Sequence, residues 1–233
     1  MRLDERLGLA YDLYAECDLA ADIGTDHGYL PLALLQGGKC RRMILTDISP
    51  DALNNARNHF AAAGMTDRVE LRQGDGLDPV TEACGMISIL GMGGKTIRGM
   101  LERGAGRLRG AKLLLSAHTD LPQVRLAVEA VGYHLTKEIP CRAAGRFYLM
   151  MLSEPGAERL TEDEKRRGKR LTESESPLLA AYLQHRLKVV EAQIRGLKST
   201  DGANPEQLSR AEADAAYYRE EIGKLQDQTE SPK

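Results

Sequence analysis

Two carboxylates, an imidazole and two glycines are crowded into the segment ADIGTDHGYLP, residues 21–31. Gly24 and Gly28 bracket Asp26 and His27, and an apolar stretch precedes them. A turn that binds a dinucleotide has the spacing G-x-G-x-x-G, so that backbone N–H groups can receive a pyrophosphate. Here the spacing is G-x-x-x-G, and the carboxylate of Asp26 would repel a pyrophosphate. The turn therefore favours S-adenosylmethionine, whose sulfonium and ammonium groups are positive, over NAD.

Further groups follow the next predicted strands, in chain order. Asp47 follows the second strand, residues 74–76 (GDG) follow the third, and residues 91–94 (GMGG) follow the fourth. In an open α/β sheet, ligands bind outside the carboxyl ends of the strands, and an acid after the second strand accepts hydrogen bonds from a ribose. Asp75 comes where an adenine amino group would need an acceptor. NAD and S-adenosylmethionine both contain adenosine, so the first turn decides between them.

Two other kinds of site are disfavoured. The segment GGKT at 93–96 lacks the first glycine of a Walker motif, because position 89 is isoleucine. No second histidine or cysteine lies near His27 in the sequence, so we expect no metal site. The four cysteines lack C-x-x-C spacing, which argues for a reducing compartment and against a disulfide framework; they are Cys17, Cys40, Cys84 and Cys141.

The elements that must position these groups alternate between strand-like and helix-like patterns. Near-continuous apolar strands separated by helices indicate a parallel sheet covered on both faces, and a short connection between the last two indicates an antiparallel hairpin at one edge. The predicted fold is an α/β doubly wound, seven-stranded, mostly parallel sheet. Strands are predicted at 19–24, 42–48, 69–74, 85–91, 111–117, 133–139 and 145–152. Helices are predicted at 29–35, 50–64, 95–108 and 121–131.

The last part of the chain has a different pattern. Apolar residues recur at helical spacing over 179–197, stop at 199–207 and resume over 208–225. Two amphipathic helices joined by a turn predict an antiparallel helical hairpin or a short coiled coil. We therefore expect a catalytic domain at 1–153 and a helical coiled-coil domain at 154–233.

Composition and charge limit the class of protein. The chain has 233 residues, 42% hydrophobic and 28% charged, with a formal net charge of −2, which gives no global attraction to nucleic acid. Five of the six residues 165–170 are basic, and indicate either a solvated helix or linker, or a patch that contacts phosphates. No apolar run approaches the roughly 20 residues of a membrane span, and the acidic N-terminal segment is unlike a secretory signal. We expect a cytoplasmic protein with no membrane partner.

Four motifs together resemble those of the bacterial tRNA (adenine(22)-N1)-methyltransferases. These motifs are ADIGTDHGYLP, TDISPDALNNARNH, LRQGDGL and ILGMGGKTI, in the family's order and at similar spacing. The resemblance covers residues 3 to about 150, and the C-terminal hairpin matches the family's appended coiled coil by architecture. The segment LLSAHTDLP lacks the Gln-Pro pair that relatives often have there. The resemblance therefore assigns no substrate-side role to residues 116–119. The resemblance implies a Rossmann-like, class I S-adenosylmethionine-dependent enzyme that methylates N1 of a position-22 type adenine in tRNA.

The implied chemistry assigns roles to residues. N1 of neutral adenine has a lone pair, so positioning suffices without a strong base, and a carboxylate stabilises the positive charge that methylation leaves. Asp26 is assigned this role or sulfonium contact, and His27 is assigned to orient the base or the carboxylate. The predicted catalytic residues are Asp26, His27, Gly91, Met92 and Gly93. The predicted cofactor-binding residues are Asp22, Gly24, Thr25, Asp26, Gly28, Asp47, Ile48, Gly74, Asp75 and Gly76.

A tRNA substrate requires phosphate contacts and an extruded adenine, because N1 lies on the pairing edge of the base. His118, just after the fifth predicted strand, is either a further residue of the cleft or a loop histidine with no role. The helical hairpin would grip tRNA or, alternatively, form a homodimer. A small-molecule methyltransferase, a non-catalytic adaptor and an NAD enzyme stay open as other functions. The candidate phosphate contacts are Arg2, Arg6, Arg98, Arg103, Arg107, Arg109 and residues 165–170.

Overall fold

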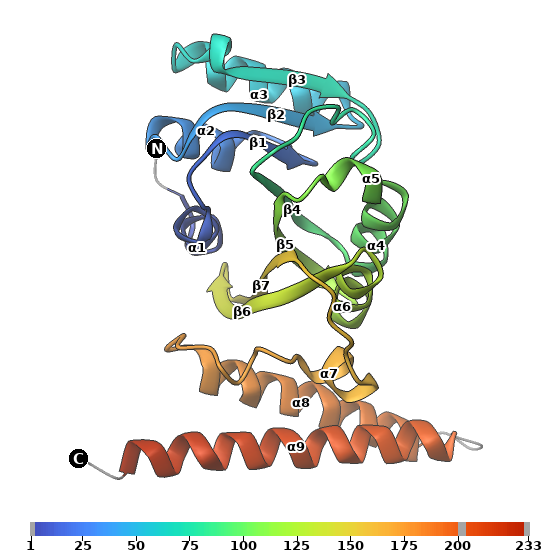
Figure 1. Ribbon diagram of the computed structural model, residues 1–233. Helices are drawn as coiled ribbons and strands as arrows, with labels where there is room; N and C mark the ends of the chain where they lie inside the picture. The colour runs from blue at the N-terminus through green and yellow to red at the C-terminus, as the bar shows by residue number, and fades with distance from the viewer. Residues whose placement is uncertain (1–2, 200–203, 231–233) are drawn as a thin grey trace. The chain divides into compact units, whose positions relative to one another are not determined.

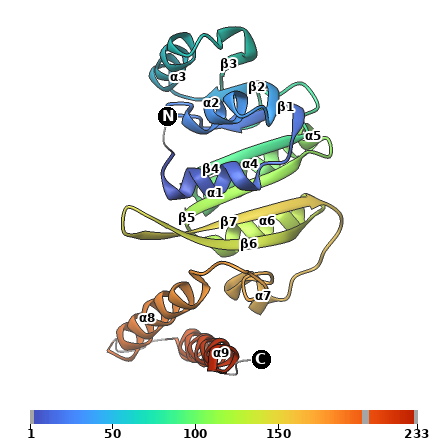
Figure 2. The same cartoon turned by 90° about the vertical axis from the view of Figure 1, so that its left-hand side faces the viewer.

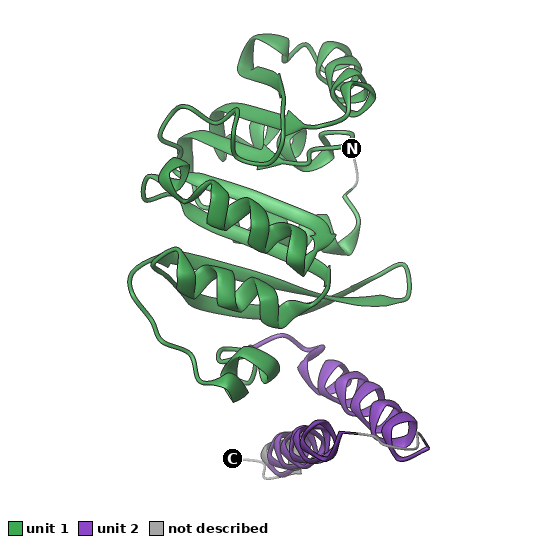
Figure 3. Cartoon of the chain, turned by 90° about the vertical axis from the view of Figure 1, so that its right-hand side faces the viewer, with its two compact units in different colours: residues 1–173 green, residues 174–233 purple. Residues whose placement is uncertain are grey.

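The computed structural model describes residues 3–199 and 204–230, which fall into two compact units (Figure 3). The first unit, Met1–Glu173, contains a seven-stranded sheet in the order β3-β2-β1-β4-β5-β7-β6 (Figure 1). Its strands are β1 (Cys17–Ile23), β2 (Cys40–Asp47), β3 (Val69–Gln73), β4 (Met86–Gly93), β5 (Lys112–Thr119), β6 (Tyr133–Ala143) and β7 (Arg146–Pro155). Its helices are α1 (Glu5–Leu13), α2 (Tyr29–Gln36), α3 (Pro50–Ala62), the 3₁₀ turn η1 (Thr66–Arg68), α4 (Gly94–Arg103), α5 (Ala105–Leu108), α6 (Leu121–Ala130) and α7 (Glu162–Arg167).

The sheet confirms the predicted architecture. All seven predicted strands are present, each within a few residues of its expected range. Strands β1 to β5 pair in parallel, whereas β7 pairs antiparallel with both β5 and β6. The reversed strand β7 therefore lies between β5 and β6, and the predicted hairpin forms one edge of the sheet.

Helices cover both faces of the sheet. Figure 2 shows α1, α2 and α3 in front of the strands and α4 and α6 behind them. Ile87 in β4 and Leu114 in β5 are completely buried. This double cover explains why the central strands are almost continuously apolar, since both of their faces pack against helices.

Local signals account for some of the helix boundaries. Helix α3 begins where Ser49 Oγ accepts a hydrogen bond from the Ala52 N–H at 3.3 Å. The single helix predicted at 95–108 is instead two, because the chain bends at Gly104, where a side-chain carbon would lie 2.6 Å from the Leu77 Cβ atom. Helix α1 was not among the predicted helices, and its first turn is capped by the carboxylate of Asp4.

The first unit extends about twenty residues beyond the boundary predicted at 153. Arg125 in α6 and Glu138 in β6 form a buried ion pair with 2.7 Å between Nε and Oε1. Arg125 Nη1 also donates to the Lys165 carbonyl at 2.8 Å, and the Arg170 N–H donates to Glu138 at 2.8 Å. These bonds attach the segment 154–173 to the sheet, so the division falls after Glu173. The functional roles of the two units stay predictions.

The basic run 165–170 is largely neutralised by neighbouring acids. Each of its five cations forms an ion pair, and Lys165, Arg167 and Lys169 have side chains no more than 26% exposed. Lys165 pairs with Glu129 and Glu162, Arg166 and Arg167 pair with Asp163, Lys169 pairs with Glu158 and Glu164, and Arg170 pairs with Glu158 and Glu173. Part of the run thus lies in the helix α7, as one of the two expectations had it, and its cations are paired with acids. Contact of this run with phosphates stays a prediction.

The second unit consists of α8 (Leu179–Lys198) and α9 (Pro205–Glu230), which pack against each other. Glu191 pairs with Arg219 at 2.7 Å, and Lys198 pairs with Glu212 at 2.8 Å. Later residues of α8 thus meet earlier residues of α9, so the helices run antiparallel. The predicted turn at 199–207 lies partly outside the described residues. No helix within 3–199 and 204–230 is long and apolar enough to cross a bilayer.

Candidate active site

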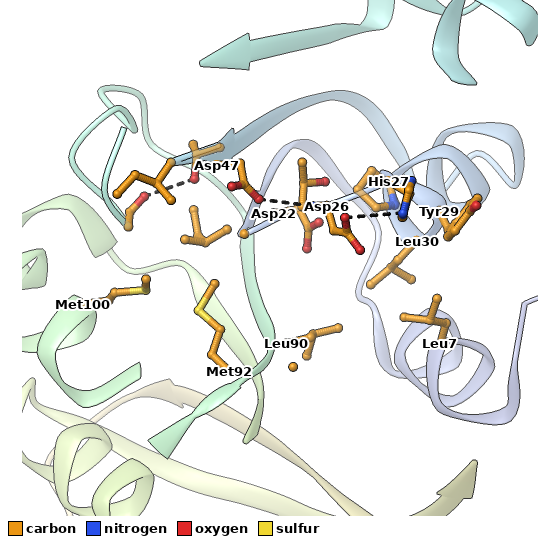
Figure 4. A pocket seen from close by; sticks show the side chains of 18 of the residues that line it. Leu7, Asp22, Asp26, His27, Tyr29, Leu30, Asp47, Leu90, Met92 and Met100 are labelled. Atoms are coloured by element: carbon orange, nitrogen blue, oxygen red, sulfur yellow. Dashed lines mark hydrogen bonds and ion pairs between the residues drawn. The ribbon is translucent and has the colours of Figure 1, made fainter. Parts of the chain in front are cut away.

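A cavity of about 440 Å³ lies at the carboxyl ends of the strands in the first unit (Figure 4). Twelve of the predicted site residues line this cavity, as expected for groups that follow the carboxyl ends of parallel strands. These are Asp22, Gly24, Thr25, Asp26, His27, Asp47, Ile48, Gly74, Asp75, Gly76, Gly91 and Met92. Figure 4 shows Asp22 and Asp26 on one side of the cavity, with Leu90 and Met92 opposite them. Segments separated by up to about seventy residues in the chain therefore share one ligand-sized space.

Asp22 is a nearly buried carboxylate at the end of β1, only 7% exposed. Ser88 Oγ in β4 donates to its Oδ1 atom at 2.5 Å, and the hydroxyl oxygen of Tyr14 lies 3.3 Å from Ser88 Oγ. Burial raises the pKa of the Asp22 carboxyl, and the hydrogen bond from Ser88 lowers the pKa in part. Ser88 was missed because a serine inside the apolar run MISIL gives no signal of a cross-strand partner.

Asp47 is held by backbone donors at the end of β2. The Ser49 N–H donates to its Oδ1 atom at 2.9 Å, and the Asp26 N–H donates to Oδ2 at 3.3 Å. The Gly74 N–H donates to the Asp47 carbonyl at 3.0 Å. One acidic residue therefore connects the turns after β1, β2 and β3, and its carboxylate faces the cavity in a defined orientation.

Gly24 makes the turn after β1 possible. Its φ is 71°, and an added side-chain carbon would lie 2.0 Å from the Met92 Cε atom. The N–H groups of Gly24 and Thr25 both donate to the Thr46 carbonyl, at 2.8 and 3.1 Å. The absence of a side chain at position 24 brings the backbone to the cavity wall beside Met92.

Two predicted site residues do not line the cavity. Gly28 caps α2 in the left-handed conformation, and a side-chain carbon there would lie 3.0 Å from Phe60 and 3.3 Å from Ala56. Its role in the structure is close packing beneath the first turn. Gly93 directly precedes α4. The first residue of that helix, Gly94, packs so tightly that an added side-chain carbon would lie 2.2 Å from the Asp120 carbonyl oxygen. Both glycines shape the turns without facing the ligand space.

The rim of the cavity carries Asp26 and His27. Asp26 has φ 49°, a conformation that few residues other than glycine adopt, and its Oδ1 atom lies 3.5 Å from His27 Nε2. The His27 ring stacks on Tyr29 with 5.4 Å between centroids, and Tyr29 stacks on His59 at 4.9 Å. Tyr29 and His59 give no signal of this contact in the sequence, because it depends on the packing of α2 against α3.

The cavity has a second end around Gly91. Arg6 lies over the Tyr148 ring with 5.3 Å to the centroid, and the His118 ring meets Tyr148 edge to face at 5.7 Å. A side-chain carbon at Gly91 would lie 3.2 Å from Arg6 Nη1 and 3.5 Å from His118 Nε2. Arg6 and His118 were candidates from the sequence, whereas Tyr148 was not. We call Arg6, Gly91, His118 and Tyr148 the Tyr148 recess.

The other predicted phosphate contacts lie elsewhere. Arg103 pairs with Asp75 at 2.6 Å, and Arg98 pairs with Glu102 at 2.7 Å. Arg107 and Arg109 donate to carbonyl groups of the loop before β4. Arg2 lies outside the described residues. Of the predicted arginines within residues 3–199, only Arg6 lines the cavity.

Comparisons with known proteins identify the family of the chain. The sequence profile of the family described as tRNA (adenine(22)-N(1))-methyltransferase matches residues 20–224. This range includes every residue that lines the cavity except those of α1. The chain belongs to this family. A Bacillus subtilis (strain 168) protein with that name is 28% identical over 158 residues, which are 67% of this chain and 66% of the relative. The aligned region thus spans just under two thirds of that relative.

Solved structures show the methyltransferase fold. An uncharacterised protein of Listeria monocytogenes serotype 4b is 26% identical, with 95% of this chain and 100% of that chain covered and a TM-score of 0.84. M. capricolum TrmK in complex with S-adenosyl-homocysteine is 21% identical, with 96% and 99% covered and a TM-score of 0.80. The predicted Rossmann-like fold is confirmed. No cluster of three or more metal-ligating side chains occurs among the described residues.

Proposed function

We propose that this protein transfers a methyl group from S-adenosylmethionine to N1 of an adenine of the position-22 type in tRNA. The proposal rests on one observation above all. In a chain of this family, four carboxylates line one end of a single cavity, where a cationic methyl donor is favoured over a pyrophosphate. We call Asp22, Asp26, Asp47 and Asp75 the acidic end.

The residues present fit such a donor. The Asp47 carboxylate is oriented by two backbone N–H groups and would accept hydrogen bonds from the ribose hydroxyls. Asp22 would pair with the ammonium group, and Asp75 would accept from the adenine amino group once Arg103 moves aside. Gly24 leaves a cradle that a side chain would fill. When bound, S-adenosylmethionine supplies an electrophilic methyl group on a sulfonium, whose sulfur keeps the electron pair as a neutral thioether.

The residues around the target would act by position and charge. Adenine N1 has a free lone pair, so no side chain has to remove a proton before the N–C bond forms. The methylated ring is cationic, and the Asp26 carboxylate at the rim would stabilise its charge as it develops. His27 would hold that carboxylate through the 3.5 Å contact. The glycine at position 91 would let the base approach the backbone closely.

The partner and setting follow from the substrate. We infer that the first unit carries the chemistry, that the α8–α9 hairpin contacts tRNA, and that the enzyme works in the cytoplasm. A homodimer through the hairpin is the alternative use of these helices, and sedimentation at several protein concentrations distinguishes a monomer from a dimer.

One assay tests the function. The protein is incubated with labelled S-adenosylmethionine and bulk unmodified tRNA, and any methylated base is mapped. We expect 1-methyladenine at one position in tRNA. Label incorporated only into small molecules would indicate a small-molecule methyltransferase. Binding of NAD without binding of S-adenosylmethionine would overturn the proposal, and binding of neither would indicate an adaptor.

A pair of matched variants ties the activity to the acidic end. Asp47→Ala removes an acid that lines the cavity, and Asp51→Ala removes an exposed acid four residues later that does not. We expect Asp47→Ala to weaken binding of S-adenosylmethionine by about tenfold or more, because hydrogen bonds to a charged group contribute about 1.5–3 kcal/mol each. Asp51→Ala should bind as the wild type. Equal affinity of both variants, measured by calorimetry, would remove Asp47 from the donor site.

Salt dependence tests the nucleic-acid substrate separately. Binding of tRNA should weaken steeply as salt rises, because each phosphate contact releases a counterion, whereas binding of S-adenosylmethionine should change little. Filter binding and calorimetry over the same salt series measure the two. A flat response for tRNA would argue against an extended RNA surface.

A further inference from the structure

The two ends of the cavity differ in charge and in the kind of side chain they present. The acidic end uses the last residues of β1 and β2 and the turns after β1 and β3, and all four of its groups are carboxylates. The Tyr148 recess uses α1, β4, β5 and β7, and it presents a guanidinium, an imidazole, a phenol ring and bare backbone. A single cavity with such ends suits two different ligands side by side.

The reversed strand explains how the recess forms. Because β7 runs antiparallel to β5, its first residues lie at the edge where β4 and β5 end. Leu115 pairs with Met151; His118 lies three residues after Leu115 in β5, and Tyr148 lies three residues before Met151 in β7. Arg6 reaches the same place from the first turn of α1. Three distant parts of the chain therefore supply one ring flanked by two cationic or polar groups.

We propose that the Tyr148 recess is the binding site for the extruded target nucleotide, with its purine base stacked on the Tyr148 ring. This proposal rests on the proposed function and names the residues that hold its substrate. Unpaired bases bind proteins by stacking on aromatic rings. The strength of this stacking depends little on the hydrogen-bonding groups of the base. The His118 ring edge would border the base. The Arg6 guanidinium, which lies over the Tyr148 ring in the structure, would move from the ring to the adjoining phosphate and contact it as a fork of N–H donors.

The position of Gly91 supports this assignment. Gly91 has φ 79°, and the space where its side chain would lie is bordered by Arg6 Nη1 and His118 Nε2. A base in the recess would therefore have its edge against bare backbone at the end of β4, next to the acidic end where the methyl donor is proposed to bind. The contact of Arg6 with the Tyr148 ring is a cation–π contact rather than an ion pair, so its charge can pair with a phosphate.

The test measures coupling between Tyr148 and the target base. First, the methylated adenine is mapped with the wild-type enzyme. Binding constants are then measured for wild type and Tyr148→Leu with two transcripts, one intact and one abasic at the mapped position. We expect wild type to lose about 5- to 150-fold in affinity when the base is removed, as for one stacked base. Tyr148→Leu should bind both transcripts equally, because this variant lacks the ring on which the target base would stack.

Controls separate base binding from a structural role. Phe147→Leu removes the ring next to Tyr148 on β7, which lies under Arg142 and not in the cavity, and it should behave as wild type. Tyr148→Phe should keep most of the activity, since the ring is retained. Affinity for S-adenosylmethionine should stay within twofold in all three variants. His118→Ala, at an exposed position, provides a second coupling measurement if Tyr148→Leu fails to fold.

The outcomes are distinct. Loss of affinity on base removal that is the same in wild type, Tyr148→Leu and His118→Ala would overturn the recess as the base site while leaving the methyltransferase function intact. Absence of any methylated tRNA with wild type would instead refute the proposed function. Coupling that is confined to the recess variants supports the inference.

Discussion

At the scale of single residues, the site depends on a carboxyl group, that of Asp22, which is buried in the protein. Asp22 is buried, receives a hydrogen bond from Ser88 and has a raised pKa because burial disfavours its ionised form. An acid in this state destabilises the fold when it is ionised, and a bound ammonium group would offset that cost. The residue thus links cofactor binding to pH.

Asp22→Asn tests this link. A raised pKa in the folded state means that wild-type stability falls as pH increases from near the ordinary aspartate value, about 3.9, through the raised value. The variant lacks this titration, so its stability relative to wild type should increase over that window and stay level above it. Its affinity for S-adenosylmethionine should fall about tenfold or more. Urea unfolding at several pH values and calorimetry measure both, and a pH-independent stability difference would contradict the argument.

At the scale of elements, the contacts between α6, β6 and the segment 154–173 hold the edge of the sheet. The Arg125–Glu138 pair is at most 1% exposed, and both partners also bond to backbone groups of that segment. A buried ion pair contributes little net stability, but removal of one partner leaves an isolated buried charge. The pair therefore specifies where the segment attaches.

Arg125→Met should lower the free energy of unfolding by about 3–5 kcal/mol, because the Glu138 carboxylate stays buried without its cation. The double variant Arg125→Met/Glu138→Leu should regain much of this loss, since no buried charge remains. Thermal and urea unfolding of the two proteins decide the matter. A single variant within about 1 kcal/mol of wild type would show that the pair is not a fixed part of the edge.

At the scale of the whole chain, the division into two units separates a cavity-bearing sheet from a helical pair. Within the described part of the chain, the residues that line the cavity all belong to the first unit. Leu160 and Leu171 in that unit are 4% and 1% exposed, although both follow the predicted boundary at 153. The segment that joins the sheet to α8 is thus part of the first unit's packing.

Two truncated chains test this division. A chain that ends at Glu173 should unfold cooperatively and bind S-adenosylmethionine. A chain that ends at Ser153 should be less stable by about 3 kcal/mol or more, because the contacts of two buried leucines are lost. Circular dichroism during urea unfolding compares them. Equal stability of both would show that 154–173 does not belong to the folded unit.

Local patterns in the sequence determined much of this protein. Alternating apolar strands and helices predicted the sheet, since each pattern needs a partner to bury its apolar face, and the acids and glycines after β1 to β4 predicted the acidic end. Ser88 beside Asp22, the Tyr148 recess and the boundary at Glu173 required the tertiary structure. These depend on the register of strands far apart in the chain and on the reversed direction of β7. Spacing along the sequence carries information about neighbours in one element, whereas side chains that meet across a sheet are chosen only when the strands pack.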